Sequence, residues 1–490
     1  MSKAIVVGSG IGGIATSIRL AVKGYDVTVF EKNPYPGGKL SVFSLGPYRF
    51  DAGPSLFTMP HFVTELFELA GEQPNTFFEY KKKEIHCEYF WEDGTRLTAY
   101  SDRHKFCQTV EQQLHVPASE LHAYLNKAQQ KYELTAPLFL ERSLHRSASY
   151  FNPETLQAIL RLGKLELFQS LHQVNLKHLK NPYLVQFFDR FATYNGSDPY
   201  QTSGIMSLVQ HLEEHYGTYI PKKGMGDITH SLVALAERMG VRFYFNRSVE
   251  ELVVNRNRCQ GIRSQGEMIP SNVVVCNGDV VPTYRALLAG HKAPELYLKQ
   301  ERSSSALIFY WGIRKTFPQL NLHNIFFSTD YQREFQAIFK EKTLIADPTI
   351  YVNITSKDIP QDAPEGCENW FVMINAPADY GQDWETLISQ TREAVIQKVN
   401  RLLNCHLEDL IEVESVLSPP LIAEKTASFR GALYGSSSNS RMSAFLRHPN
   451  FSTRFKNLFF CGGSVHPGGG IPLCLLSAKI ASELIPMPHV

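Results

Sequence analysis

The stretch that most constrains the fold lies at the amino terminus, where an apolar run leads directly into a glycine-rich turn. The run Ala4-Ile5-Val6-Val7 predicts a buried strand, and residues 8–13 (GSGIGG) follow it without interruption. In this spacing Gly8 allows a tight turn, Gly10 lets backbone N–H groups approach a pyrophosphate, and Gly13 lets the next helix pack closely on the strand. Because the start of a helix attracts anions, the stretch predicts a phosphate-binding turn between a strand and a helix.

A second predicted strand, residues 26–30 (DVTVF), ends on Glu31, which lies 18 residues after Gly13. In dinucleotide-binding folds, a carboxylate about 20 residues beyond the glycines accepts a hydrogen bond from a ribose hydroxyl. A 2′-phosphate would be repelled by this carboxylate, so the pattern favours a nucleotide without one. The alternative is a glycine-rich turn without a ligand, which leaves the second strand and its terminal carboxylate unexplained.

Length, charge and cysteine content limit the remaining possibilities. The 490 residues exceed a single core and predict about two to four structural units. The 49 Lys and Arg residues balance the 48 Asp and Glu residues, so overall charge does not favour a nucleic-acid partner. The eight cysteines form no CxxC pair, so we expect neither a zinc site nor a disulfide framework, and we assign no metal ligands. We expect no export signal and no membrane span.

Three further segments carry a resemblance to a known family. They are residues 32–39 (KNPYPGGK), residues 50–53 (FDAG) and the carboxyl-terminal stretch 457–472 (NLFFCGGSVHPGGGIP). Together with the first motif, they resemble bacterial carotenoid desaturases of the phytoene-desaturase type, within the flavin amine oxidase-like superfamily. The resemblance implies that FAD is the cofactor and that Lys39 balances phosphate charge. The alternative for Lys39 is a solvated loop lysine.

The resemblance implies cofactor-binding roles for residues from both ends of the chain: Gly8, Ser9, Gly10, Gly13, Glu31, Lys32, Gly38, Lys39, Val249, Gly463, Ser464, Gly470, Ile471 and Pro472. Val249 is included because the matching residue of the family meets the adenine ring through its backbone. Without the resemblance, Val249 is interpreted only as a strand residue.

Two residues are candidates for acid–base catalysis. Glu154 aligns approximately with a proposed acid–base position in the helical region of the family, where the accompanying arginine is replaced here by Gln157. His466 belongs to the His-Pro-Gly turn, and the alternatives for it are a structural role or no role. Because a flavin performs most of the chemistry of such a reaction, catalysis by His466 is not required.

We predict an α/β fold with three parts. A Rossmann-type FAD-binding domain is assembled from the discontinuous segments 1–75, 215–290 and 448–490. An α+β substrate domain that contains a sheet covers residues 76–110 and 291–447. A helical insertion that associates with a membrane covers residues 111–214. Within the insertion, residues 151–184 combine leucines with Lys and Arg, which predicts a helix pair at a membrane surface. The alternative is a set of core helices with a solvated outer face.

The carboxyl-terminal sequence GGSVHPGGGIP (462–472) is similar to the branch that introduces a 3,4-double bond into hydroxylated or monocyclic carotenoids of the 1-hydroxy-γ-carotene type. We therefore expect an FAD-dependent oxidoreductase of carotenoid biosynthesis, with a carotenoid and a membrane surface as partners and with oxygen or a quinone as electron acceptor. We expect it to be cytoplasmic and peripherally bound to the inner face of the cell membrane. The alternatives are a phytoene desaturase, a carotenoid isomerase or retinol-saturase-like flavoprotein, and a non-catalytic flavin-fold escort.

Overall fold

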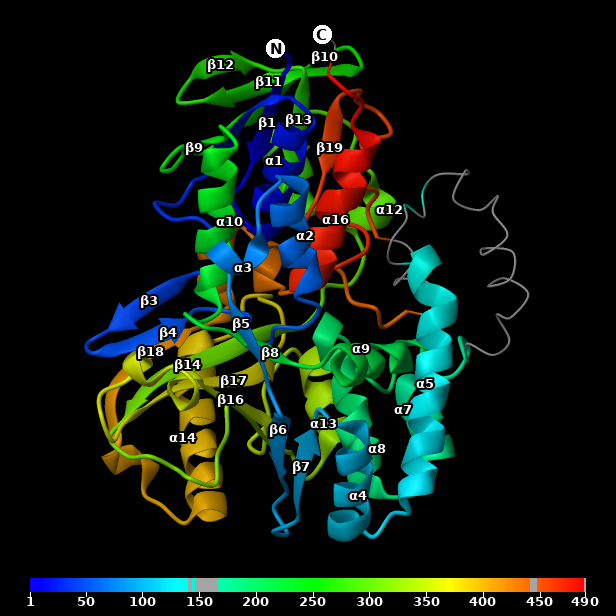
Figure 1. Ribbon diagram of the computed structural model, residues 1–490, viewed down its shortest axis with the longest axis vertical. Helices are drawn as coiled ribbons and strands as arrows, with labels where there is room; N and C mark the ends of the chain where they lie inside the picture. The colour runs from blue at the N-terminus through cyan, green and yellow to red at the C-terminus, as the bar shows by residue number, and fades with distance from the viewer. Residues whose placement is uncertain (140–142, 144, 146–165, 441–446, 489–490) are drawn as a thin grey trace.

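A computed structural model describes residues 1–139, 143, 145, 166–440 and 447–488. Figure 1 shows a parallel sheet with its helices in the upper part of the molecule. A second sheet with one long helix lies at the lower left, and the helices of the insertion lie at the lower right. The chain passes between these parts several times, so each part is built from separate segments of the sequence.

The upper sheet is five-stranded and parallel, in the order β19-β13-β1-β2-β9. Its strands come from three separate parts of the chain: β1 (Lys3–Val7), β2 (Asp26–Phe30), β9 (Arg242–Tyr244), β13 (Val273–Cys276) and β19 (Leu458–Phe460). These parts fall within the segments 1–75, 215–290 and 448–490. The apolar composition of β1 and β13 follows from their central place in a parallel sheet, where both faces are covered.

The two faces of this sheet have different covers. Ala4 and Val6 of β1 face a cluster formed with four helices: α1 (Ile11–Val22), α2 (His61–Leu69), α10 (Gly226–Arg238) and α16 (Ile471–Leu484). Ile5 faces the opposite cluster, which includes a small antiparallel sheet made of β10 (Glu251–Asn255), β11 (Arg258–Ser264) and β12 (Glu267–Pro270). The alternation of β1 side chains therefore joins two separate cores.

The lower sheet has seven strands in the order β18-β14-β17-β16-β15-β6-β7. Its strands are β6 (Ile85–Phe90), β7 (Arg96–Tyr100), β14 (Ser305–Ile313), β15 (His323–Phe326), β16 (Ile350–Ile354), β17 (Glu368–Ala376) and β18 (Ile411–Leu417). The pairing of β15 with β6 is parallel, and it attaches the early hairpin β6–β7 to strands that follow some two hundred residues later. The helix α14 (Trp384–Leu403) covers one face of the sheet.

The described part of the insertion is helical and packs on the β6–β7 edge of the lower sheet. Its helices are α4 (Arg103–Leu114), α5 (Ala118–Phe139), α7 (Leu171–His178), α8 (Pro182–Asp189) and α9 (Val209–Tyr216), with short 3-10 segments at Arg190–Asn195 and Gly204–Leu208. Within the described ranges, no helix is both long and apolar enough to span a bilayer.

Short elements connect these parts. They are α3 (Pro74–Phe77), the pair β5 (Tyr80–Lys82) and β8 (Tyr219–Pro221), α11 (Val280–Pro282), α12 (Glu295–Leu298), α13 (Tyr331–Gln336) and α15 (Pro419–Thr426). The hairpin of β3 (Val42–Leu45) and β4 (Tyr48–Asp51) corrects one expected boundary. Tyr48 and Phe50 pack in one cluster with Tyr310 of the lower sheet, although residues 1–75 were assigned to the FAD-binding domain. The helix α4 likewise crosses the boundary placed at residue 110.

Candidate cofactor and substrate cavity

A cavity of about 1020 Å³ lies between the upper and lower sheets. On the upper side it is lined by residues at the carboxyl ends of parallel strands, such as Val7 of β1, Phe30 of β2 and Asn277 after β13. Ligands of open parallel sheets bind at this edge. On the lower side it is lined by side chains of β14, β16 and β17 and by the insertion. One cavity therefore connects a nucleotide-type site to a large apolar space.

Most of the residues assigned to the cofactor from the sequence line this cavity: Gly8, Gly10, Glu31, Lys32, Gly38, Lys39, Val249, Gly463, Ser464, Gly470, Ile471 and Pro472. Ser9 and Gly13 lie behind the lining. Val249 lies in the loop between β9 and β10, so its interpretation as a strand residue was wrong. Glu154 lies outside the described residues.

Glu31 and Ser9 form the hydrogen-bonded end of β2. The Oε2 atom of Glu31 accepts from the Ser9 backbone N–H at 2.8 Å and from the Ser9 hydroxyl at 2.9 Å, and its Oε1 atom accepts from the Asn33 N–H at 2.9 Å. A carboxylate offers about four acceptor positions, so roughly one remains beside the cavity. Ser9 therefore orients Glu31, while Glu31 is positioned to accept from a ribose hydroxyl.

The glycines of the first turn are required by close packing. A Cβ atom on Gly13 would lie 2.1 Å from the Gly8 carbonyl oxygen, and a Cβ atom on Gly10 would lie 2.8 Å from the side-chain nitrogen of Asn277. Gly8 has a φ of 95°, in the left-handed region that favours glycine. The structure thus gives the helix α1 its close approach to β1 and leaves backbone N–H groups at the cavity wall.

Asn277 is a lining residue that was not assigned to the cofactor from the sequence. Its Nδ2 atom donates to the Gly8 carbonyl at 3.4 Å, and its Oδ1 atom accepts weakly from the Cys461 thiol at 3.6 Å. It therefore joins the first glycine turn to the carboxyl-terminal one. The signal in the sequence was its place directly after the strand 273–276, where side chains at a carboxyl end reach a ligand.

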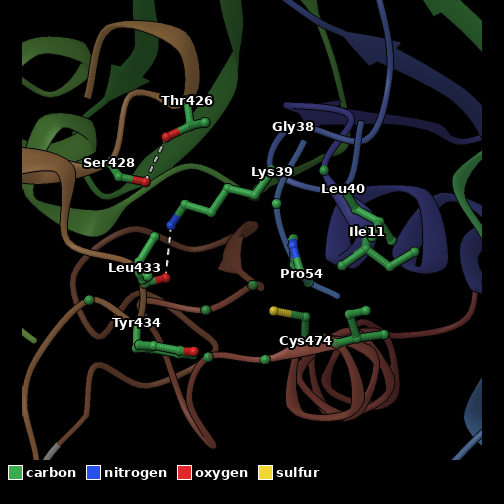
Figure 2. Close-up of a pocket in the computed structure, with 18 of the residues that line it drawn as sticks. Ile11, Gly38, Lys39, Leu40, Pro54, Thr426, Ser428, Leu433, Tyr434 and Cys474 are labelled. Carbon is green, nitrogen blue, oxygen red and sulfur yellow. Dashed lines mark hydrogen bonds between the residues drawn. The ribbon is translucent and has the colours of Figure 1, made fainter. Parts of the chain in front are cut away.

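Lys39 extends from the second glycine segment into the cavity (Figure 2). Its Nζ atom donates to the Leu433 carbonyl at 2.8 Å and to the Ala432 carbonyl at 3.3 Å. Burial lowers the pKa of Lys39, and Asp279 acts in the opposite direction. A cation held by two carbonyls beside the glycine turns fits an anionic ligand, so the interpretation as a solvated loop lysine was wrong.

The carboxyl-terminal turn supplies a second helix start. The helix α16 begins at Ile471 after Gly470, and both residues line the cavity with Pro472. The Ser464 hydroxyl accepts from the Val280 backbone N–H at 3.1 Å, which ties this turn to the segment after β13. Unpaired N–H groups at the start of this fourteen-residue helix add positive potential to the same cavity.

His466 does not line the cavity, although Ser464 and Pro467 of the same turn do. Its side chain is buried, its ring lies 5.9 Å from that of His145, and its backbone N–H donates to the His448 carbonyl at 3.0 Å. The imidazole is not among the side chains that line the cavity. The structure therefore favours the structural alternative for His466 over the catalytic one.

The lower part of the cavity is largely apolar and aromatic. It is lined by Tyr310, Phe371 and Met373 of the lower sheet and by Ile205 and Leu212 of the insertion. The Tyr310 hydroxyl donates to the Ala52 carbonyl at 2.6 Å, so it presents its ring to the space. Such walls exclude water and accept a long hydrocarbon.

These observations fit FAD. Two glycine turns and two helix starts offer N–H groups for a pyrophosphate, Glu31 offers an acceptor for a ribose hydroxyl, and Lys39 offers a cation. Among the described residues, no group of three or more His, Cys, Asp or Glu side chains is arranged to hold a metal ion. The donor set thus defines the class of protein as a dinucleotide-dependent oxidoreductase with an apolar substrate space.

Comparison with known proteins identifies the family. The sequence model of the family of flavin containing amine oxidoreductases matches residues 11–486, and the chain belongs to this family. It is 54% identical over 486 residues to the 1-hydroxycarotenoid 3,4-desaturase of Flavobacterium sp. (strain P99-3), with 99% of each chain covered. It is 31% identical to the phytoene desaturase of Fusarium fujikuroi, with 98% of this chain and 88% of that protein covered.

Solved structures share the fold at low identity. An oxidoreductase of Methanosarcina mazei matches with a TM-score of 0.66 and 13% identity, covering 98% of this chain and 100% of that one. Putrescine oxidase bound to putrescine matches with a TM-score of 0.63 and 12% identity, with 98% of each chain covered. The resemblance to carotenoid desaturases is therefore confirmed, as are a mixed α/β fold, FAD as the cofactor and membership of the FAD-dependent oxidoreductases.

Proposed function

We propose that this protein is an FAD-dependent desaturase that introduces a 3,4-double bond into a 1-hydroxycarotenoid. The observation that carries the proposal is the single cavity, in which a nucleotide site opens into a long apolar space. The relative with 54% identity, named as a 1-hydroxycarotenoid 3,4-desaturase, supports the choice of substrate. A phytoene desaturase is the second candidate, because a relative with that name matches at 31% identity.

Desaturation removes one hydride and one proton from neighbouring carbons of the substrate. When bound, FAD would supply the hydride acceptor, with oxygen or a quinone as the final electron acceptor. The protein side chains hold the allylic C–H bond near the cofactor end of the cavity and exclude water. Because the positive charge left on the substrate is spread along the polyene, a weak base suffices to take the proton.

Expression in cells that accumulate defined carotenoids tests this proposal. We expect a 1-hydroxycarotenoid to gain one double bond, seen as a longer-wavelength absorption and a mass lower by two hydrogens. Conversion of phytoene with no reaction of the hydroxylated substrate would instead support the phytoene desaturase. Bound flavin that stays oxidised when either carotenoid is added without oxygen would support a non-catalytic escort.

We further propose that the protein is cytoplasmic and binds the inner face of the cell membrane, because an insoluble carotenoid has to enter the cavity from lipid. Residues 151–165 of the expected membrane segment lie outside the described residues. In its described part, Phe168 is 78% exposed and Leu176 is 57% exposed, which supports lipid contact there. Leu171, within the same segment, is 0% exposed and belongs to the core, so it does not face the membrane.

A further inference from the structure

One wall of the apolar cavity is polar, and the desaturation chemistry does not account for it. Six buried titratable or amide side chains from separate parts of the chain line the cavity, and we call them the polar wall: His86, Arg190, Asn195, Glu213, His323 and Tyr331. Each is at most 9% exposed. A polar wall inside a hydrocarbon-binding cavity is costly to bury, so it indicates a polar group on the ligand or ordered water.

Several of these side chains keep a buried polar atom without a hydrogen-bond partner among the described residues. The atoms are Nε2 of His86, Nε of Arg190, Oδ1 of Asn195, Nε2 of His323 and the hydroxyl of Tyr331. Buried polar groups in native proteins nearly always have partners. Finding several unpartnered atoms in residues that line one cavity is therefore evidence for an absent partner that both donates and accepts hydrogen bonds.

The charges of the wall are paired with each other. Arg190 Nη2 lies 3.6 Å from Oε1 of Glu213, and His86 Nδ1 lies 3.4 Å from the same oxygen. Burial alone would raise the pKa of Glu213, but Arg190, His86 and Tyr194 together lower it to about 2. Since the carboxylate already balances the guanidinium, the ligand group has no need of charge, and a neutral hydroxyl fits better than a carboxylate or an amine.

His323 shows the direction of the free hydrogen bonds. Its Nδ1 atom lies 2.7 Å from the Tyr351 hydroxyl and 3.2 Å from Nδ2 of Asn353, which can only donate. Burial lowers the pKa of His323 to about 3, so the ring is neutral at neutral pH. Because Nδ1 accepts, the single ring proton lies on Nε2, and this N–H donor points to an oxygen acceptor that the chain does not supply.

A chain of two hydrogen bonds links His323 of the wall, through Tyr351, to Ser55 on the cofactor side of the cavity. The Tyr351 hydroxyl is 2.8 Å from the Ser55 hydroxyl, and Ser55 follows Pro54, which Figure 2 shows beside Lys39 and Cys474. In a 3,4-desaturation, only carbon 2 separates the hydroxyl-bearing carbon 1 from the reacting carbon 3. The recognition of that hydroxyl therefore has to occur next to the cofactor, as this chain of hydrogen bonds allows.

We propose that the polar wall binds the hydroxyl group at the reacting end of the carotenoid, through the unpartnered atoms of His86, Arg190, Asn195, His323 and Tyr331. This assignment rests on the proposed function and adds the residues that select the substrate. A site that hydrogen-bonds a hydroxyl discriminates strongly against an analogue that lacks it, because its own buried polar groups are then left unpaired. The remaining aromatic walls contact only the polyene.

Tyr331→Phe is the sharpest variant, because it removes one hydroxyl that has no described partner and keeps the ring packed on Phe327 and Phe335. Tyr89→Phe is the matched control. Tyr89 also has a buried hydroxyl and lies in the same apolar cluster, but it does not line the cavity. A second variant, Arg190→Met with Glu213→Gln, removes the buried pair together, so that no lone charge remains.

The experiment compares a 1-hydroxycarotenoid with the analogue that carries hydrogen in place of the hydroxyl. Both Kd, from quenching of flavin fluorescence, and kcat/KM are measured with the FAD-loaded enzyme. We expect the wild type and Tyr89→Phe to prefer the alcohol by roughly tenfold or more. In Tyr331→Phe this preference should be smaller, by about the contribution of one hydrogen bond. The paired variant should lower the preference further.

An unchanged preference for the alcohol in Tyr331→Phe and in the paired variant would overturn the assignment. Equal binding of both carotenoids by the wild type would also overturn it. Ordered water would then be the partner of the wall. Product formation without any preference would overturn the subsite and leave the desaturase. Conversely, a Kd preference that Tyr331→Phe reduces, without product from either carotenoid, would support the subsite and overturn the desaturation.

Discussion

Replacing Glu31 by glutamine separates two roles of this carboxylate, which holds the first turn and is positioned to bind the ribose of FAD. The side chain accepts three hydrogen bonds, two from Ser9 on Oε2 and one from the Asn33 N–H on Oε1. A glutamine has a single oxygen, so it can serve only one of these two sides. Its NH2 group then faces a donor on the other side, which leaves at least one buried donor unpaired.

The magnitudes follow from these contacts. One unpaired buried donor lowers the free energy of unfolding of the apoprotein by about 1–3 kcal/mol. The bond to the ribose changes from charged to neutral, which weakens it by about 1–2 kcal/mol and raises the Kd for FAD roughly tenfold. In Glu31→Arg, a buried cation replaces the acceptor, and we expect a larger rise in the Kd.

Two measurements on the apoprotein keep these effects apart. Urea unfolding reports the stability of the turn, and titration with FAD, followed by the quenching of its fluorescence, reports the Kd. Glu250→Gln is the control, since Glu250 accepts the backbone N–H groups of Gln265 at 2.9 Å and Gly266 at 3.2 Å at an exposed site outside the cavity. A wild-type Kd in a destabilised Glu31→Gln protein would refute the contact with the ribose.

Four further outcomes follow. Because burial lowers the pKa of Lys39, the unfolded chain binds more protons than the folded protein at a pH above the folded pKa. The stability of the apoprotein should therefore rise towards pH ~10, and urea unfolding should show a smaller rise in Lys39→Met. Burial lowers the pKa of His323 to about 3 and that of His448 to about 4, so circular dichroism should show stability falling as the pH decreases below ~6.5. Phe168→Ser with Leu176→Ser should reduce binding to anionic liposomes, whereas Met268→Ser, 41% exposed on β12, should not. Deuterium at the allylic carbon should slow flavin reduction in a single turnover, and equal rates would exclude C–H cleavage as the slow step.

The cofactor half of the site was predictable because its requirements are local and concern the backbone. A Cβ atom on Gly13 or Gly10 has no room, so the spacing of the glycines reports the turn without knowledge of the fold. Glu31 was found for the same reason, since the strand that ends on it follows at a fixed distance. Ser9 was assigned to the cofactor, but a hydroxyl in a glycine turn can donate either to a ligand or to a neighbouring carboxylate. Only the structure shows that the Ser9 hydroxyl donates to Glu31.

The polar wall was not predictable from the sequence, because its residues come together only through tertiary contacts. His86 and His323 become neighbours because β15 pairs in parallel with β6, with Asn324 opposite Glu88. No spacing in the sequence predicts that pairing. Arg190 and Glu213 reach the same wall from different helical segments. Side chains assembled in this way can be replaced one by one without disturbing the glycine turns assigned to the cofactor. The polar wall is therefore where we expect the choice of carotenoid to be made.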